Sequence, residues 1–258
     1  MDALSVLSFG VCPMICPLCG HEQSDGFVEC SQCGVIFGKI HTNEEKNHIR
    51  IDENVESGPS SPAEELRGLF FSVKTDGDPI ILSLKAILIA IILIWSLKLF
   101  FTPIEEAGNN ILHYVNLPFH EAGHIIFRPF GEFLTVLGGS LFQLIMPLIC
   151  CFVLLLKTRD PFGASMAFWW FGENFIDMAP YINDARALKL TLLGGVTGKD
   201  RPGFHDWENI LGTLGMLPYD HAIASAAMWL GLICMITACA WAGFLLYKEF
   251  TLMLKHLR

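Results

Sequence analysis

Residues 79–101 read PIILSLKAILIAIILIWSLKLFF, and this stretch decides the fold because residues 86–95 form an unbroken apolar run. About 23 helical residues at about 1.5 Å each reach about 34 Å, which is enough to cross a hydrocarbon core of about 30 Å. Lys85 and Lys98 stand where their long side chains can extend toward the two membrane interfaces. The stretch therefore predicts a transmembrane helix.

The composition of the whole chain agrees with a membrane protein. Of its 258 residues, 52% are hydrophobic and 17% are charged, whereas soluble domains carry roughly 25% charged residues. The formal net charge is −9, from 26 acidic against 17 basic residues. A polycationic surface for nucleic acid is therefore not expected.

Hydropathy predicts further spans at about residues 133–156, 161–182 and 222–247. We expect residues 80–258 to form an all-α polytopic membrane domain with four to five transmembrane helices. The open case is 108–128, where a helix between Pro118 and Pro129 is too short to cross alone. Joined to the residues before Pro118, this segment would span; as a short helix, it would be re-entrant.

Residues 117–129, LPFHEAGHIIFRP, contain the strongest chemical signal. His120 and His124 are four residues apart, so on a helix both imidazoles leave the same face and can bind one ion. Glu121 lies beside them, where it can take a proton from an attacking water. Ionisable groups in such an apolar stretch carry an energetic cost and indicate a functional site. The motif predicts a catalytic zinc site in the membrane domain.

Such a site needs a third protein ligand, and the sequence leaves several acids open. Glu173, Asp177 and Asp184 would share roughly one helix face if Pro180 only kinks the helix. A weaker pair of candidates is His205 and Asp206. The simpler interpretation of that pair is that Asp206 caps a short helix beginning at Trp207.

An H-E-x-x-H motif in a membrane helix, followed two spans later by a Pro-containing segment with an aspartate, resembles the site-2 protease family of intramembrane zinc metalloproteases. The family's second motif has Asn, two residues, Pro, three residues, then Leu-Asp-Gly. Here residues 177–185 read DMAPYINDA, so Asp177 replaces the Asn and the Pro-to-Asp interval is one residue shorter. The resemblance implies Asp184 as third zinc ligand, with Asp177 as its rival. It also implies peptide-bond hydrolysis within or beside the bilayer, and it likens GEFLTVLGGSLFQ (131–143) to a segment where backbone can approach a substrate strand. Close helix packing at Gly138 and Gly139 is the equal alternative for this segment.

The first 79 residues are organised differently. Two C-x2-C pairs in residues 12–40 are spaced like a metal-binding knuckle and predict a zinc ribbon with one structural Zn²⁺; the ligands are Cys16, Cys19, Cys30 and Cys33. Residues 41–79 are polar and lack an apolar period, so we expect a flexible linker. Reduced cysteines place the ribbon on the cytoplasmic side of the membrane, where it would bind a protein partner or regulate the domain.

The sequence thus predicts a multi-pass membrane zinc metallopeptidase that acts on transmembrane or membrane-proximal proteins. Two alternatives stay open. One is a non-catalytic membrane adaptor in which a cytosolic ribbon recruits a protein and the buried site holds a structural metal. The other is a metal transporter, although a transporter has no need of Glu121 between the two histidines. Basic residues fit two topologies, because they accommodate either a re-entrant or a spanning segment 108–128.

Overall fold

The computed structural model describes residues 13–16, 21–24, 28–32, 35–37, 62–73 and 78–256. The chain divides into two compact units, residues 1–61 and residues 62–258. The described part is mostly helical, as the sequence predicts for the larger unit.

The smaller unit contains an antiparallel pair of short strands, β1 (Pro13–Ile15) and β2 (Glu22–Ser24), with Pro13 opposite Ser24. Two cysteine amides in this unit each donate a hydrogen bond to the carbonyl of the residue five positions later. The Cys16 amide donates to the His21 carbonyl at 2.8 Å, and the Cys30 amide donates to the Val35 carbonyl at 2.9 Å. Both cysteine side chains are buried. Because Cys19 and Cys33 lie outside the described residues, the zinc ribbon stays a prediction.

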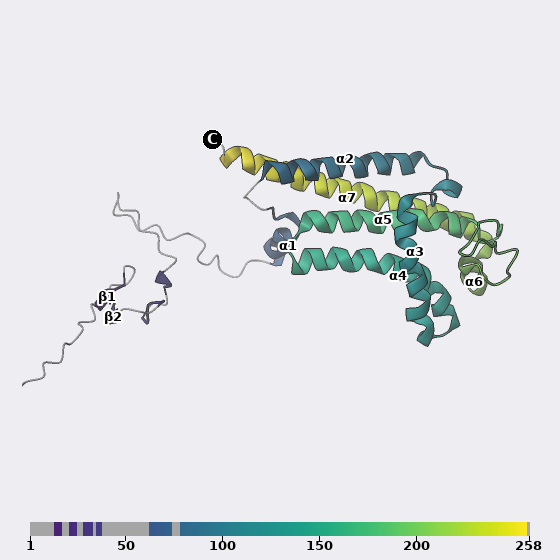
Figure 1. The fold of residues 1–258 in the computed structure, drawn as a ribbon, viewed down its shortest axis with the longest axis horizontal. Helices are drawn as coiled ribbons and strands as arrows, with labels where there is room; N and C mark the ends of the chain where they lie inside the picture. The colour runs from purple at the N-terminus through teal and green to yellow at the C-terminus, as the bar shows by residue number, and fades with distance from the viewer. Residues whose placement is uncertain are drawn as a thin grey trace, which may run out of the picture. The chain divides into compact units, whose positions relative to one another are not determined.

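Seven α-helices make up the described part of the larger unit (Figure 1): α1 (Pro62–Phe71), α2 (Pro79–Phe101), α3 (Ile111–Phe127), α4 (Glu132–Phe152), α5 (Pro161–Asn183), α6 (Asp206–Thr213) and α7 (Asp220–His256). Helix α4 continues as a π-helical turn through Val153–Lys157. Short 3-10 turns at Ile104–Glu106, Arg128–Phe130 and Leu217–Tyr219 connect neighbouring helices.

Helix α1 corrects the predicted linker, because it occupies residues 62–71 of a segment expected to lack structure. Pro62 begins the helix, and Leu69 and Phe70 at its other end pack against buried residues of α5 and of the segment after α4. The indole of Trp241 donates to the Phe70 carbonyl at 2.8 Å. Tertiary contacts of two apolar side chains therefore stabilise a helix that its own composition did not predict.

Three of the described helices are long and apolar enough to cross a membrane, consistent with a membrane protein: Pro79–Phe101, Glu132–Lys157 and Leu217–Lys255. They correspond to three of the four predicted spans. The remaining predicted span is a helix, α5, with almost the predicted bounds. It is not among the three, because polar, glycine and tryptophan residues interrupt its apolar composition.

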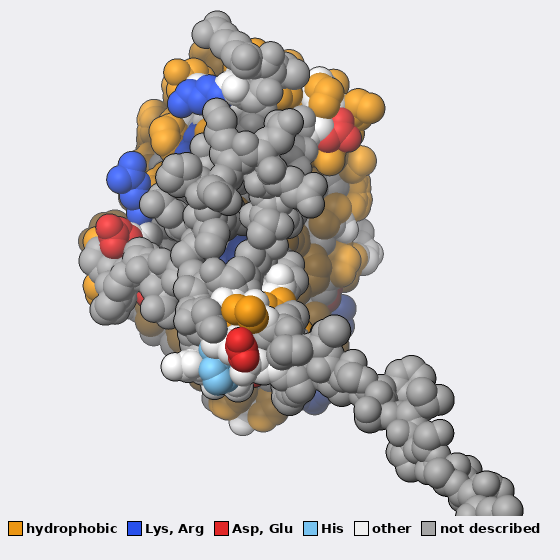
Figure 2. All heavy atoms as spheres, turned by 90° about the vertical axis from the view of Figure 1, so that its left-hand side faces the viewer, with side chains coloured by type: hydrophobic (Ala, Val, Ile, Leu, Met, Phe, Trp, Pro, Cys, Tyr) orange, Lys and Arg blue, Asp and Glu red, His pale blue; other side chains and the backbone are white. Residues whose placement is uncertain are grey.

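The outer surface of these helices is apolar. Helix α2 packs on α7 and turns most of its large apolar side chains outward, among them Ile80, Leu84, Ile87, Ile91, Ile94 and Leu97. Figure 2 shows orange hydrophobic side chains along the visible flanks of the described helices. An outward apolar surface of this extent suits lipid rather than water.

Helix α5 lies between α4 and α7 (Figure 1) and supplies much of the core. Gly172 of α5 and Gly231 of α7 let the two backbones approach, since a Cβ at either position would lie within 2.8 Å of the other's carbonyl oxygen. The interior also holds polar side chains from three helices: Asn116, Gln143, Glu173, Asn174 and Asp177. One of them, Gln143, lies 3.1 Å from a ring nitrogen of His120.

Helix α3 carries the H-E-x-x-H motif. Its length bears on whether residues 108–128 span the membrane or are re-entrant. It has 17 residues, a length of about 26 Å, which is short of a hydrocarbon core of about 30 Å. It lies crosswise to α2, α5 and α7 (Figure 1). Pro118 is accommodated inside the helix, so the motif belongs to one continuous element.

Candidate metal centre

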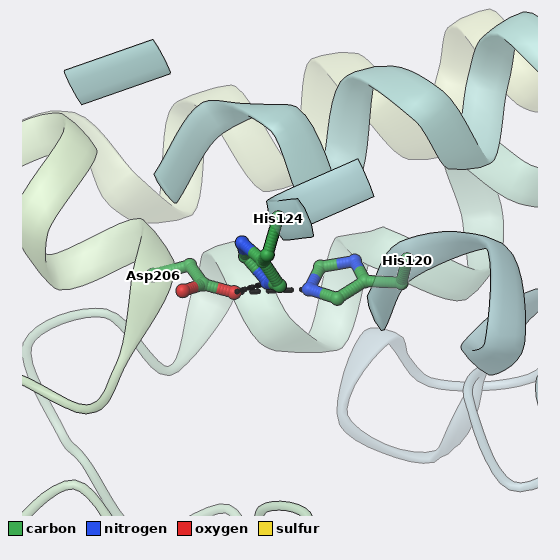
Figure 3. A group of neighbouring side chains, drawn as sticks. All are labelled: His120, His124 and Asp206. Carbon is green, nitrogen blue, oxygen red and sulfur yellow. Dashed lines mark hydrogen bonds and ion pairs between the residues drawn. The ribbon is translucent and has the colours of Figure 1, made fainter. Parts of the chain in front are cut away.

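The two histidines of the motif project from one side of α3, as their spacing predicts. The side chain of Asn110 caps the start of the helix by accepting a hydrogen bond from the Leu112 amide at 2.8 Å. One turn separates His120 from His124, and their ring centroids are 4.8 Å apart. The Nε2 atoms of both rings point to the same place (Figure 3).

The third group at this place is Asp206, from the first turn of α6. One carboxylate oxygen, Oδ2, lies 2.9 Å from His120 Nε2 and 3.3 Å from His124 Nε2. The three side chains converge in Figure 3, and they form the group of described residues that could hold a metal ion. Tetrahedral zinc with bonds of about 2.0–2.1 Å separates its ligand atoms by about 3.3 Å. The separation of 3.3 Å matches this value, and the separation of 2.9 Å is shorter by about 0.4 Å.

Residues around α6 fix the position of Asp206. His205 is the N-cap of α6, and its Nδ1 accepts a hydrogen bond from the Glu208 amide at 3.2 Å. The Tyr181 hydroxyl accepts a hydrogen bond from the Asp206 amide at 2.8 Å, and its ring packs on His205 with centroids 4.3 Å apart. The expectation that Asp206 itself caps the helix is therefore wrong. Since His205 performs the capping, the Asp206 carboxylate is available to the imidazoles.

Hydrogen bonds on the far side of each ring determine which imidazole nitrogen carries a proton. His124 Nδ1 lies 2.8 Å from the carbonyl oxygen of Thr135, which can only accept. His120 Nδ1 lies 3.1 Å from the side-chain oxygen of Gln143, which also accepts. Each ring therefore carries a proton on Nδ1 and directs its Nε2 toward Asp206, where Nε2 holds either a second proton or, in the neutral ring, a lone pair.

This arrangement requires a positive charge among three acceptors. Partial burial of the Asp206 carboxyl favours its neutral form, but hydrogen bonds that His120 and His124 donate when Nε2 carries a proton outweigh this effect and lower its pKa to about 2. The carboxylate is therefore ionised at neutral pH. Two neutral imidazole lone pairs beside a carboxylate oxygen repel one another, unless the rings gain a second proton or a metal cation lies between them.

Gly139 of helix α4 leaves space for the imidazoles of His120 and His124, because it has no side chain. A Cβ at Gly139 would lie 2.6 Å from His124 Nε2 and 2.7 Å from His120 Nε2, closer than real contacts allow. Gly138 also contacts α3, because its Cβ would lie 2.8 Å from the Gly123 carbonyl oxygen. The segment 131–143, singled out in the sequence, thus brings its backbone against the candidate metal ligands.

Glu121 lies next to this group on α3 and is half-buried. Its charge acts on His124 and on Tyr181, two residues that border the site. Its carboxylate accepts no hydrogen bond from the described residues. It is therefore available as a base beside the three convergent side chains.

The other predicted acids lie elsewhere. Asp184 follows the end of α5 and accepts hydrogen bonds from the Lys189 and Leu190 amides at 3.0 and 2.8 Å, closing the turn after that helix. Its carboxylate is 3.6 Å from His205 Nε2. Asp177 is buried and binds His113, Asn116 and Gln143. Neither acid contacts the motif histidines, whereas Asp206, the weaker candidate from the sequence, does.

Several residues of the centre were not predicted, namely Thr135, Gln143 and Tyr181. Thr135 contributes only a backbone carbonyl, which no sequence pattern marks. Gln143 does carry a signal, because it is the sole strongly polar side chain within residues 136–156 before Lys157. Buried polar residues in an apolar run indicate a partner in the interior.

The described residues are mostly helical, and they include three helices suited to crossing a membrane and a His/His/Asp group that could hold a metal. Comparison with protein-family models, with curated proteins and with solved structures found no match.

Proposed function

We propose that the chain is a membrane-embedded zinc metallopeptidase that hydrolyses peptide bonds in or near the bilayer. The observation that carries the proposal is the approach of Asp206 to His120 and His124, at 2.9 and 3.3 Å. Glu121 lies beside this group, and its carboxylate accepts no hydrogen bond from the described residues. Two imidazoles and one carboxylate are a typical ligand set of catalytic zinc, which keeps its fourth position for water or substrate.

Each side chain has a definite role in this proposal. His120, His124 and Asp206 would hold Zn²⁺, which supplies Lewis acidity for activating water and polarising the scissile carbonyl. Glu121 would take a proton from the attacking water and pass it to the leaving amine. Gly139 would leave space beside the imidazoles, and Tyr181 and His205 would keep Asp206 in reach.

The surroundings of α3 support a substrate at the membrane. Ile125, Ile126 and Phe130 are exposed at the end of α3 and in the turn that follows, and α4, which packs on α3, is apolar enough to cross the bilayer. A transmembrane substrate would have to unwind locally, because a regular helix keeps its carbonyls in internal hydrogen bonds. Membrane-proximal segments would meet the site with less unwinding.

The smaller unit would add a structural role. The repeated hydrogen bond at Cys16 and Cys30 and the spacing of Cys19 and Cys33 support a second Zn²⁺ bound by the four cysteines. Four thiolates close the coordination shell, so this ion would stabilise the unit rather than catalyse. We assign the unit to the cytoplasmic side, where it would bind a protein partner.

The test is Glu121→Gln in the full-length protein in lipid nanodiscs, with Glu132→Gln as a matched control. Glu132 is exposed at the start of α4, away from the imidazoles. Glu121→Gln should retain the zinc content of the wild type but lose about 10²–10⁴-fold in cleavage of a model transmembrane substrate, since it removes the base and no metal ligand. Glu132→Gln should cleave normally.

Undiminished cleavage by Glu121→Gln would contradict the peptidase proposal. A wild-type protein that holds zinc and cleaves neither transmembrane nor membrane-proximal peptides would support the adaptor instead.

A further inference from the structure

A buried hydrogen-bonded chain extends from the candidate metal centre into the middle of the helical unit. Gln143 stands between His120 and Asp177, with its oxygen 3.1 Å from His120 Nδ1 and its nitrogen 2.9 Å from Asp177 Oδ2. Asp177 also accepts a hydrogen bond from Asn116 at 3.0 Å and lies 3.0 Å from His113 Nδ1. Among these hydrogen-bonded side chains, only that of His113 is substantially exposed, with 43% of it accessible.

The order of donors and acceptors in this chain follows from Asp177. The amide nitrogen of Gln143 donates to the carboxylate oxygen Oδ2 of Asp177 at 2.9 Å. The amide oxygen of Gln143 is then left to face His120, where it can only accept. His120 therefore carries its proton on Nδ1 and keeps the Nε2 lone pair toward Asp206. Without the Asp177 carboxylate, the side-chain amide of Gln143 could rotate by about 180° and direct its NH2 toward His120. His120 would then carry its proton on Nε2 instead of Nδ1.

We propose that Asp177 is a positioning residue that acts through Gln143 to hold His120 as the tautomer whose Nε2 binds the metal. The inference rests on the metal centre proposed above and deepens it. It gives a role to Asp177, which neither caps a helix nor hydrogen-bonds to His120 or His124. Partners of this kind on the far side of a ligating histidine raise metal affinity by about 10–100-fold.

A variant of Glu173 distinguishes a positioning role of Asp177 from a role in helix packing alone. It lies one turn before Asp177 on α5, is fully buried, and accepts a hydrogen bond from the same Asn116 nitrogen at 3.0 Å. No hydrogen bond joins it to Gln143, whose amide nitrogen donates to Asp177. If the two acids only stabilised the packing of α3 on α5, their neutral amide variants would affect the metal centre alike. If Asp177 orients Gln143, only its replacement would.

The experiment uses full-length protein in nanodiscs with ¹⁵N-labelled histidine, and Zn²⁺ alone as the probe. The His120 signals are assigned by their loss in His120→Gln. The ring nitrogens report the tautomer in zinc-free protein at a pH where imidazole is neutral, and their response to Zn²⁺ reports affinity at this site. The variants are Asp177→Asn, Gln143→Leu and the control Glu173→Gln.

A double variant, Gln143→Glu/Asp177→Asn, tests rescue. The carboxylate that it introduces at position 143 can accept a hydrogen bond from His120 Nδ1 and another from the amide introduced at position 177. Because a carboxylate cannot donate, the direction of the hydrogen bond to His120 no longer depends on an acid at position 177.

We expect wild-type His120 to be protonated on Nδ1. Asp177→Asn should give a mixture of tautomers and about tenfold weaker zinc binding, and Gln143→Leu should bind zinc about 10–100-fold more weakly. Glu173→Gln should match the wild type in both readouts. The double variant should recover the Nδ1–H tautomer and the affinity lost in Asp177→Asn.

A wild-type tautomer and affinity in Asp177→Asn would overturn the inference, as would equal losses in Asp177→Asn and Glu173→Gln. Failure of the metal centre itself has a different signature, because wild-type His120 would then not respond to Zn²⁺ at all. The tautomers of the zinc-free proteins would still decide the role of Asp177 in that case.

Discussion

Replacement of Gly139 tests the metal centre without replacing any of its three candidate ligands. An alanine Cβ there would lie 2.6–2.7 Å from the Nε2 atoms of His124 and His120. Neither ring can swing away freely, because Thr135 and Gln143 hold the opposite nitrogens. Gly139→Ala should therefore displace at least one imidazole and weaken zinc binding in the membrane domain by about tenfold or more, the size of effect seen when support of a ligand is lost.

The measurement for Gly139→Ala is zinc affinity by chelator competition, and Gly243→Ala is the control. Gly243 lies on α7, and a Cβ at that position meets nothing within 4 Å. Unaltered affinity in Gly139→Ala would mean that the imidazoles do not meet against α4.

At the same scale, the sequence could predict the histidines but not their third partner. The i, i+4 spacing of His120 and His124 depends only on helix geometry, and the structure keeps both on one side of α3. Asp206 is 86 residues from His120, and it reaches the site because Tyr181 and His205 hold the start of α6. No local pattern encodes that approach. The motif match favoured Asp184, which the structure uses to close a turn.

Helix α5 shows what the sequence could and could not predict at the level of elements. The helix predicted at 161–182 is present as Pro161–Asn183, although it is not among the described helices apolar enough to cross a membrane. Glu173 and Asp177 do share a face, since both bind Asn116. The helix ends before Asp184, so the predicted three-acid face is shorter than expected. Helix α1 was missed because its stability comes from Leu69 and Phe70 packing on distant helices, which is information outside its own segment.

The α5–α7 contact gives a prediction at the element scale. A Cβ at Gly231 would lie 2.5 Å from the Gly172 carbonyl oxygen and 2.6 Å from the Ile176 side chain. Gly231→Val should force the two helices apart and destabilise the domain by about 1–3 kcal/mol, the usual cost of overpacking. The thermal unfolding midpoint in detergent should fall, while Gly243→Ala on the same helix should leave it unchanged. An unchanged midpoint in Gly231→Val would show that this contact is looser than the structure indicates.

On the scale of the whole molecule, composition and hydropathy predicted a helical membrane domain, and three described helices are suited to crossing a bilayer. The chain places its polar interior around α5 and its apolar side chains outward on α2. That division explains how a buried site with two imidazoles and a carboxylate is compatible with an apolar exterior. The two compact units also allow two metals to be bound independently.

The most direct measurement of the central claim is the zinc content of purified full-length protein, compared among the wild type, Asp206→Asn and Asp184→Asn, with Cys16→Ser to count the ribbon's ion separately. The account predicts two zinc ions per wild-type chain. Asp206→Asn should lose one of them, Cys16→Ser should lose the other, and Asp184→Asn should keep both. A full zinc content in Asp206→Asn, or the loss of the membrane-domain ion in Asp184→Asn alone, would contradict the assignment of His120, His124 and Asp206 as the metal centre.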